Sequence, residues 1–579
     1  RPDSASMAFI GQVSAARRAA STPRSIPPWP DGARRASLRP NTRGGNEMSD
    51  TVPTQADYVV VGAGSAGCAV AARLSESANV LLIEAGGNNR RLAVKVPAAF
   101  PKQFHSKIDW DYWTEPEPHL NGRRVFSPRA KVMGGCSEMN AMIYIRGNRV
   151  DYDSWADGGA EGWSYDDVLD VFKRSECNDQ FDNQFHGTAG PLKVTRIPDI
   201  DPVTVALIDA AAAHGVNRNN DFNGKEQDGT GQMQVTQHRG MRFGSAEAYL
   251  APLAHRRNLS IRKNTLATRI VIEGGRAVAV EVADGKGGTE KIRARAEIVL
   301  SGGAFNTPAL LQHSGIGPAD FLRSIGVTPV VDLPAVGTHL MEHPLATVSY
   351  ELADGYTGLA DAENPKYLAQ WLTRRRGKLT SNIAEGGIHV RTDASMPAPN
   401  FQILLSPSFF DNHGQMAWEV PAATMGLSYI APRSRGSVRI RSNDPSRKPR
   451  VTYNMFSTQS ELEEMVDAVE FARAVAANAQ NSGVLRAEIT PGDGVRTREE
   501  IKNWIRTTVQ HTYHPSCTAR IGSPTDGVVD PKLRVHGVDG LRIADTSIMP
   551  TVIRGNTHAP AVMIGERCAD FIKESRVSR

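Results

Sequence analysis

The 579-residue sequence lacks the features that mark several common protein classes. It contains no C-x-x-C pair and only five cysteines, namely Cys68, Cys136, Cys177, Cys517 and Cys568. An odd number of scattered cysteines argues against a disulfide framework or a zinc ribbon, and it favours a reducing compartment. No apolar run approaches the roughly 18 residues of a membrane-spanning helix. We therefore predict a cytoplasmic protein with no transmembrane segment.

Excess charge of one sign is also scarce beyond the start of the chain. Residues 1–47 hold eight arginines against three acids, and this imbalance accounts for the whole net charge of +5. The rest of the chain is balanced, which argues against a basic face that binds nucleic acid. We predict no nucleic-acid partner.

The first 47 residues are rich in Arg, Ser, Ala, Pro and Gly and poor in large apolar side chains. Such a segment cannot bury enough surface to offset its chain entropy, so we expect it to be disordered. Its composition fits an organelle-targeting peptide. An artefact of translation upstream of Met48 and a functional tail fit as well, and the three interpretations remain open.

The segment Asp57–Gly87 is the most informative part of the chain. It predicts a buried strand at Tyr58–Val61, a glycine turn, a helix, and a second strand at Val80–Ile83 that ends on Glu84. The turn matches G-x-G-x-x-G, which is typical of dinucleotide-binding βαβ units. A purely structural βαβ unit is the alternative, and the carboxylate at the end of the second strand argues against it.

Each part of this motif has a physical task. Gly62 permits the tight turn, Gly64 lets the backbone approach a pyrophosphate, and Gly67 lets the helix pack on the strand. The N-terminus of the helix adds free N–H groups and a partial positive charge. Glu84 has the position of a carboxylate that binds ribose hydroxyls. The motif predicts a bound dinucleotide but does not identify it.

Four further segments carry glycine turns or candidate polar groups. They are Arg129–Arg146 (RAKVMGGCSEMNAMIYIR), Ile298–Gly317 (IVLSGGAFNTPALLQHSGIG), His514–Gly522 (HPSCTARIG) and Leu541–Met563 (LRIADTSIMPTVIRGNTHAPAVM). Other patterns predict strands at Val348–Leu352 and Ser437–Ile440 and helices at Ser460–Asn478 and Ala559–Ile572. At this length we expect two or more domains.

Over residues 55–575 the chain resembles the glucose–methanol–choline (GMC) oxidoreductases, flavoproteins that oxidise alcohols. Gly303–Gly317 is similar to the second signature of that family. The Gly134-Gly135 segment is similar to the first, although Met133 and Cys136 depart from it. His514-Pro515 resembles the HPxGT element with Cys517 in place of glycine, and Val336–His343 (VGTHLMEH) resembles VGxNLxDH.

The resemblance implies an α/β fold with a Rossmann-like FAD-binding domain and an α+β substrate-binding cap that contains an antiparallel sheet. The FAD-binding domain would comprise residues 55–340 and 511–579, and the cap residues 341–510. The implied cofactor is FAD. Some members attach it covalently through a histidine where this chain has Met139, so we predict noncovalent FAD. The cofactor-binding residues that it implies are Gly62, Gly64, Ser65, Ala66, Gly67, Glu84, Ala85, Gly134, Gly135, Ser137, Asn140, Ala267, Ala544, Asp545, Asn556 and Thr557.

Two histidines are the catalytic candidates. Oxidation of an alcohol requires a base for the hydroxyl proton while hydride leaves the carbon, and imidazole suits this task near neutral pH. His514 matches the active-site histidine of the family and is predicted to be the base. His558 is predicted to hydrogen-bond the substrate oxygen as alkoxide character develops. His511 and His514 lack a third ligand cluster and an H-E-x-x-H motif, so we predict no metal.

The substrate is predicted to be a small alcohol, and the electron acceptor to be a quinone, a dye-like acceptor or oxygen. A dehydrogenase is favoured because similarity is strongest to the choline-dehydrogenase-like branch, with an oxidase as the alternative. A hydroxynitrile lyase and a photodecarboxylase of the same fold are further alternatives. Apolar and aromatic residues such as Pro407–Phe410 and Trp418 are compatible with an aromatic or medium aliphatic alcohol, although core packing explains them as well.

Overall fold

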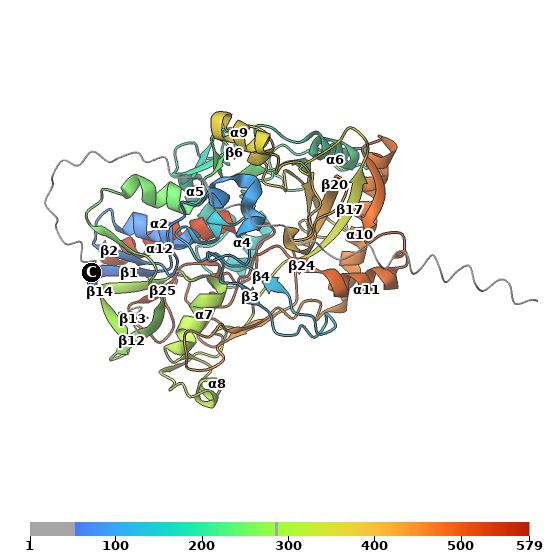
Figure 1. Cartoon of the computed structure of the whole chain (residues 1–579). Helices are drawn as coiled ribbons and strands as arrows, with labels where there is room; N and C mark the ends of the chain where they lie inside the picture. The colour runs from blue at the N-terminus through green and yellow to red at the C-terminus, as the bar shows by residue number, and fades with distance from the viewer. Residues whose placement is uncertain (1–52, 284–287, 578–579) are drawn as a thin grey trace, which may run out of the picture.

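Two seven-stranded sheets organise the protein, as the computed structural model of residues 53–283 and 288–577 shows (Figure 1). The segment 1–47, for which we predicted disorder, lies outside these described residues. In Figure 1 the first sheet lies on the left with α2 and α12, and the second lies on the right with α10. The predicted pairing of a Rossmann-like α/β sheet with a second, antiparallel sheet is confirmed.

The first sheet has a parallel centre built from segments that are distant in sequence. Its strand order is β11-β2-β1-β14-β13-β12, with β25 paired to β14. The bounds are β1 Gln55–Val61, β2 Val80–Ile83, β11 Leu259–Arg262, β12 Ala267–Glu273, β13 Arg276–Ala283, β14 Thr289–Leu300 and β25 Leu541–Ile543. The pairs of β1 with β2 and β14, of β2 with β11 and of β14 with β25 are parallel, whereas β12 and β13 are antiparallel additions.

The register of these parallel strands places three loops at one edge of the sheet. Val61 pairs with Leu300, and Leu300 pairs with Ile543. The residues that follow these strands are Gly62, Ser301 and Ala544, so the glycine turn, the second signature and the Asp545 loop begin side by side. Ligands of open α/β sheets bind at this edge, beyond the carboxyl ends of the strands.

Two helices pack closely against one another beside this edge. α2 (Ser65–Leu74) follows the glycine turn, and α12 (His558–Val577) is the C-terminal helix. A Cβ atom on Gly565 of α12 would lie 2.4 Å from the carbonyl oxygen of Ala66. The absence of a side chain at Gly565 therefore lets the backbones of the two helices approach and fixes the position of α2.

The second sheet is antiparallel and carries the other large core. Its order is β23-β17-β20-β19-β18-β7, with β24 paired to β17. The bounds are β7 Gly229–Gln232, β17 Pro344–Leu352, β18 Gly386–Val390, β19 Phe401–Ser406, β20 Ala422–Tyr429, β23 Leu485–Thr490 and β24 Gln510–His511. α6 (Pro202–Ala213), α10 (Gln459–Asn481) and α11 (Arg498–Thr508) contribute to the same hydrophobic cluster as β17, β19 and β20.

The second sheet is not confined to the expected cap, residues 341–510. Strand β7 and helix α6 come from residues 202–232, well before it. Conversely, β21 (Ser437–Arg439) lies within the expected range but pairs with β22 (Arg450–Thr452) in a separate two-stranded sheet, and it packs near α7 (Gly303–His313). The membership of the second sheet depends on pairing between strands that are distant in sequence. Local sequence patterns do not predict such pairing.

The remaining elements are short and lie between or around the two sheets. The helices are α3 Leu92–Lys95, α4 Arg149–Asp157, α5 Tyr165–Ser175, α8 Ala319–Ser324 and α9 Pro365–Arg374, and the single-turn segments are η1 Pro97–Gln103, η2 Gly135–Glu138, η3 Ala246–Leu250, η4 Ala251–Leu253, η5 Lys378–Thr380, η6 Asn412–Gly414 and η7 Thr546–Ile548. The strands are β3 Tyr112–Trp113, β4 Phe126–Ser127, β5 Glu176–Asn178, β6 Leu192–Arg196, β8 Gln234–Val235, β9 Gln237–His238, β10 Met241–Arg242, β15 Ile316–Gly317 and β16 Val331–Asp332.

The elements predicted from sequence patterns are present. The strand expected at Val80–Ile83 is β2, and the helix expected at Ser460–Asn478 is α10 with a few more residues at its ends. The helix expected at Ala559–Ile572 is α12. Across residues 53–283 and 288–577, no helix combines the length and the apolar character needed to cross a membrane. Location in the cytoplasm stays a prediction.

The contact of α12 with α2 gives a first prediction. Gly565→Ala should lower the free energy of unfolding by about 1–3 kcal/mol, because the added methyl group overpacks the helix contact. Gly494→Ala is the matched control, since a Cβ there meets no atom within 4 Å. Thermal melts of the purified variants should show a lower Tm for Gly565→Ala alone. Equal melting temperatures would contradict the close contact.

Candidate active site

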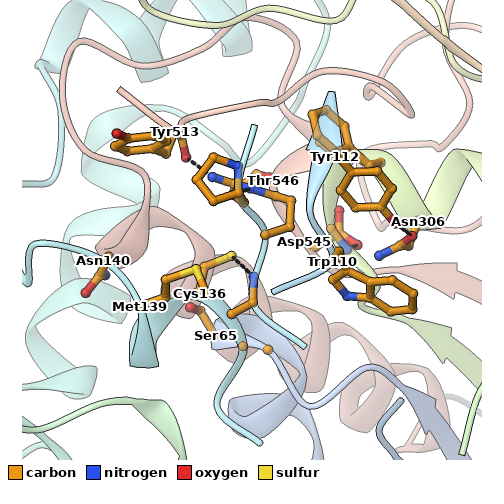
Figure 2. Close-up of a pocket in the computed structure, with 18 of the residues that line it drawn as sticks. Ser65, Trp110, Tyr112, Cys136, Met139, Asn140, Asn306, Tyr513, Asp545 and Thr546 are labelled. Carbon is orange, nitrogen blue, oxygen red and sulfur yellow. Dashed lines mark hydrogen bonds between the residues drawn. The ribbon is translucent and has the colours of Figure 1, made fainter. Parts of the chain in front are cut away.

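One cavity begins at the strand edge of the first sheet and ends beneath the second sheet. Most of the predicted site residues line it: Gly62, Gly64, Ser65, Ala66, Glu84, Ala85, Gly135, Asn140, Ala267, His514, Asp545, Asn556, Thr557 and His558. Figure 2 shows Cys136 and Met139 from one loop facing the cavity, with Trp110, Tyr112 and Asn306 beside Asp545. The sequence segments that carried the prediction therefore meet in one place.

Glycines build the part of the cavity next to the first sheet. Gly62 has φ of 102°, and a Cβ there would lie 2.4 Å from the carbonyl oxygen of Ser301. A Cβ on Gly67 would lie 1.9 Å from the carbonyl oxygen of Gly62, and one on Gly135 would lie 2.6 Å from Cα of Gly64. The turn and the Gly134-Gly135 loop are thus in backbone contact, which leaves a cradle with N–H groups and no side chains.

Glu84 ends β2 at the far side of this cradle. Its Oε2 accepts the N–H of Ala63 at 2.9 Å, and its Oε1 accepts the N–H of Gly86 at 2.7 Å. These bonds fix the carboxyl group while each oxygen keeps a lone pair for a ribose hydroxyl. Burial raises the pKa of Glu84 to about 7, against the opposing effect of the two N–H donors.

Asp545 connects the loops at the middle of the cavity. Its Oδ2 accepts the N–H of Gly303 at 2.9 Å and the hydroxyl of Thr307 at 2.6 Å, and its Oδ1 accepts the N–H of Ser547 at 2.8 Å. Burial raises the pKa of its carboxyl group. Asp545 therefore holds the loop after β25 against the N-terminus of α7.

Four predicted site residues do not line the cavity but shape it from behind. Gly67 packs on Gly62, and Ala544 is buried with its N–H bonded to the carbonyl of Leu300. Gly134 has φ of 95°, and the hydroxyl of Ser137 donates to its carbonyl oxygen at 2.7 Å. Ser137 also accepts the N–H of Ser245 at 2.9 Å. These residues support the cradle and do not face it.

The cavity fits a dinucleotide at its first-sheet end. Among the described residues, three buried polar atoms of cavity-lining side chains have no hydrogen-bond partner: Oγ of Ser301 and Nε2 of His558 beside the cradle, and Nδ1 of His313. Buried polar groups are normally paired, so unpaired donors beside a glycine cradle indicate a polar ligand. The cradle, the carboxyl group of Glu84 and these unpaired atoms together match the pyrophosphate and ribose of a dinucleotide.

His514 projects into the cavity from a strained turn. The preceding residue, Tyr513, has φ of 66°, a left-handed conformation that is uncommon outside glycine. The guanidinium of Arg129 donates to the carbonyl oxygen of Tyr513 at 2.7 Å, and the N–H of Tyr513 donates to Nδ1 of His511 at 3.0 Å. These contacts hold the turn, and His514 is 6% exposed.

Two neighbours of His514, Glu342 and His343, were not predicted as site residues. Oε1 of Glu342 accepts the N–H of His514 at 2.7 Å and the N–H of His343 at 2.8 Å. The Nδ1 atoms of His343 and His514 lie 2.9 Å apart. The sequence contained one signal for the contact between His343 and His514. Each of these two histidines precedes a proline in a segment that resembles a family motif.

The structure places His558 beside the glycine cradle, and its role at the substrate oxygen stays a prediction. Its Nδ1 atom lies 3.0 Å from the hydroxyl of Ser65, at the start of α2, so it belongs to the cradle. The residue that contacts His514 is Asn556, whose Nδ2 atom lies 3.2 Å from Nε2 of His514. The two residues are separated by one position at the start of α12, and only the turn into that helix decides which side chain reaches His514.

Burial keeps the imidazoles of the cavity uncharged. It lowers the pKa of His343 and of His558 to about 4. It also lowers the pKa of His514 well below the ordinary value, with further lowering by His343 and Arg129. His514 is therefore a neutral base at pH 7. Among the described residues, no group of histidine, cysteine, aspartate and glutamate side chains has the arrangement of a metal site.

The wall beneath the second sheet is largely apolar. Leu345 and Thr347 of β17, Leu404 of β19 and Phe410 line it together with Tyr513. Phe410 belongs to the aromatic segment that we singled out, whereas Trp418 is 45% exposed. The carboxyl groups among the described cavity-lining residues are those of Glu84 and Asp545, both at the other end.

Comparison with known proteins identifies this arrangement. The family model described as GMC oxidoreductase matches residues 56–345, and a second GMC oxidoreductase model matches residues 432–565. A GMC-type oxidoreductase of Mycobacterium tuberculosis is 40% identical over 90% of this chain and 99% of its own length. An oxygen-dependent choline dehydrogenase of Sinorhizobium fredii is 39% identical over 90% of this chain and 95% of its own.

Solved structures with the same fold oxidise different substrates, as their names state. Pyridoxine 4-oxidase from Mesorbium loti has a TM-score of 0.80 and 30% identity and covers 89% of this chain and 98% of its own. Formate oxidase from Aspergillus oryzae, described with FAD, has a TM-score of 0.85 and 26% identity and covers 91% and 100%. The fold is therefore shared more widely than any one substrate.

The contact between the two glycine loops gives a second prediction. Gly135→Ala should abolish most flavin binding, because the methyl group would collide with Gly64 and disturb the cradle. Gly159→Ala is the control, since Gly159 also has positive φ, of 96°, but a Cβ there meets no atom within 4 Å. The ratio of flavin to protein absorbance reports the outcome. Full flavin content in Gly135→Ala would contradict this geometry.

Proposed function

Since the chain belongs to the GMC oxidoreductase family, we propose that it oxidises an alcohol to an aldehyde or ketone with His514 as the base. The observation that carries this proposal is the placement of His514. Its neutral imidazole is buried in the cavity, and the amide of Asn556 reaches its Nε2 atom. A base for the hydroxyl proton and a hydrogen-bond donor for the substrate oxygen therefore lie side by side.

FAD is the cofactor, in agreement with the family and with the dinucleotide features of the cavity. When bound, it accepts the hydride that leaves the alcohol carbon. We propose that the Gly62–Gly67 turn, Ser301 and His558 hold the pyrophosphate and that Glu84 holds the ribose. Noncovalent binding stays a prediction, supported by the thioether of Met139 at the position of the linking histidine.

The other residues of the cavity prepare the base for its task. Glu342 holds the backbone of His514 and His343, and we propose that the apolar side chains of Leu345, Leu404 and Phe410 limit the access of water. Exclusion of water strengthens the hydrogen bond from Nδ2 of Asn556 to a substrate oxygen that gains negative charge. As the hydroxyl group of the substrate loses its proton, Nε2 of His514 accepts it.

Substitution of the base gives the third prediction. In His514→Ala, anaerobic addition of a substrate alcohol should bleach the flavin at least about 100-fold more slowly than in wild type, because general base catalysis is lost. The flavin content should stay the same, since His514 lies beyond the cradle. His558→Ala should show the reverse pattern, with weakened flavin binding.

Rapid bleaching by the His514→Ala variant would contradict the assignment. The wild-type reaction also reports the electron acceptor, which the proposal leaves as oxygen, a quinone or a dye. Admission of air to the bleached enzyme should restore the flavin absorbance within one turnover time in an oxidase, and slowly in a dehydrogenase. Cyanide release without bleaching would instead favour a lyase.

The charges around the cavity favour a neutral alcohol. The cations that line it include Arg129, Arg447 and Lys448, and Arg129 has no carboxylate within ion-pair distance among the described residues. The hydroxyl of Thr347 is bonded to Asp411, and that of Ser406 to Ser408. A cationic substrate would therefore lose its hydration without gaining a carboxylate partner, which costs several kcal/mol.

A matched pair of substrates tests this preference and is the fourth prediction. Choline and 3,3-dimethylbutan-1-ol have nearly the same shape but differ in charge. We expect kcat/KM for the neutral alcohol to exceed that for choline at least about tenfold, because contacts of a cation with aromatic rings recover only part of the desolvation cost. Equal or higher kcat/KM for choline would contradict the preference and leave alcohol oxidation intact.

A further inference from the structure

A buried glutamine on the second sheet contacts the residue that contacts the base. Gln402 lies on β19 and is fully buried, although burial of an amide is costly unless it is hydrogen-bonded. Its Nε2 atom lies 3.0 Å from Oδ1 of Asn556 and 3.3 Å from Nε2 of His389. His389 is its cross-strand neighbour on β18. Neither Gln402 nor His389 lines the cavity, so neither contacts a ligand there.

This contact determines which end of the Asn556 amide faces His514. The amide has one oxygen, which accepts, and one NH₂ group, which donates. Gln402 donates to Oδ1 of Asn556. The NH₂ group of Asn556 therefore faces Nε2 of His514, at 3.2 Å. A donor at this position requires a lone pair on Nε2. The base atom of His514 is then free of its own proton.

The orientation of the Gln402 amide follows from the two acceptors that its NH₂ group contacts, on Asn556 and His389. Burial lowers the pKa of His389 to about 3, so its ring is neutral and offers a lone pair. The NH₂ group of Gln402 has two protons, one for Asn556 and one for His389, and only its Oε1 stays unpaired. Among the described residues this arrangement leaves Oε1 of Gln402 and one N–H, on Nδ1 of His389, unpaired. A reversed amide would leave both N–H groups of Gln402 unpaired, and buried N–H groups tolerate this less well than carbonyl oxygens.

The other side of His514 completes the arrangement. Its Nδ1 atom lies 2.9 Å from Nδ1 of His343, so the two atoms share one proton. With a lone pair on Nε2, a neutral His514 must carry its proton on Nδ1 and donate it to His343. The contact with His343 is therefore compatible with the tautomer of His514 that Asn556 favours.

We propose that Gln402 is a positioning residue that acts through Asn556 and holds His514 in the tautomer with Nδ1–H and a free Nε2. The proposal rests on the proposed function, in which Nε2 of His514 accepts the substrate proton. Gln402 and His389 belong to the second sheet, whereas Asn556 precedes α12 beside the first. The tautomer of His514 therefore depends on a contact between residues of the two sheet regions, Gln402 and Asn556.

Removal of the amide tests this proposal. Gln402→Met should lower kcat by about tenfold, part of the ~10²–10⁴-fold that a positioned base contributes. The acid limb of the kcat/KM profile should move to higher pH, because the freed Asn556 can turn its oxygen to Nε2 and stabilise a proton there. Gln237→Met is the control. Gln237 is also buried, and its Nε2 donates to the carbonyl oxygen of Thr380.

A double-mutant cycle separates positioning from general damage. If Gln402 acts through Asn556, Gln402→Met should cause no further loss of kcat in an Asn556→Ala background. A purely structural role would give additive losses, and Gln237→Met should add its small effect in both backgrounds. Flavin content and Tm of each variant show that the loaded enzyme is compared throughout. Additive losses would overturn the proposal.

A readout without turnover distinguishes this proposal from the proposed function. In ¹⁵N-histidine-labelled, flavin-loaded protein, the His514 signals are assigned by their loss in His514→Gln. We expect the Nδ1–H pattern in wild type and a shift toward a mixture of tautomers in Gln402→Met. An Nε2–H pattern in wild type would overturn the inference. Failure of every alcohol to bleach the flavin, with the Nδ1–H pattern present, would reject only the proposed function.

Discussion

The structure depends on the register of three parallel strands in the first sheet. Val61, Leu300 and Ile543 lie in one row across β1, β14 and β25, although 482 positions separate the first from the last. The loops that follow these strands must therefore begin at the same edge, where backbone N–H groups have no partner in the sheet. A slip of one residue in either pair would turn the loops away from one another. The cradle, the Asp545 contacts and the start of α12 all follow from this row.

Burial governs the chemistry of the site, because it acts in opposite directions on acids and bases. It raises the pKa of the Glu84 and Asp545 carboxyl groups and lowers the pKa of the His514 and His558 imidazoles. Each of these groups is consequently driven toward its neutral form. A neutral imidazole can accept a proton, and an apolar wall beside it keeps water from competing for the substrate. The two sheets achieve this only together, since β17 and β19 supply the wall and the first sheet supplies the floor.

Membership of the family indicates an oxidoreductase, whereas the solved structures show that the fold does not specify the substrate. Similar folds carry names as different as pyridoxine 4-oxidase, formate oxidase and choline dehydrogenase, so the fold by itself does not select a substrate. The side chains that line the cavity under the second sheet include Phe410 and Thr347, and we propose that they take part in substrate selection.

Short-range patterns in the sequence were sufficient to predict a dinucleotide, its glycine turn, the carboxylate of Glu84 and most of the long elements, and the resemblance to the family added FAD and His514 to these predictions. Val80–Ile83 and the helix around Ser460–Asn478 are examples in which local periodicity was sufficient. The contact of Asn556 with His514, the contacts of Glu342 and His343 with the same residue, and the bond from Gln402 to Asn556 became evident only in the folded protein. The tertiary structure also brought β7 into the second sheet. The physical reason is that hydrogen bonds between distant strands and loops set these contacts, and no local pattern in the chain encodes which segments will meet.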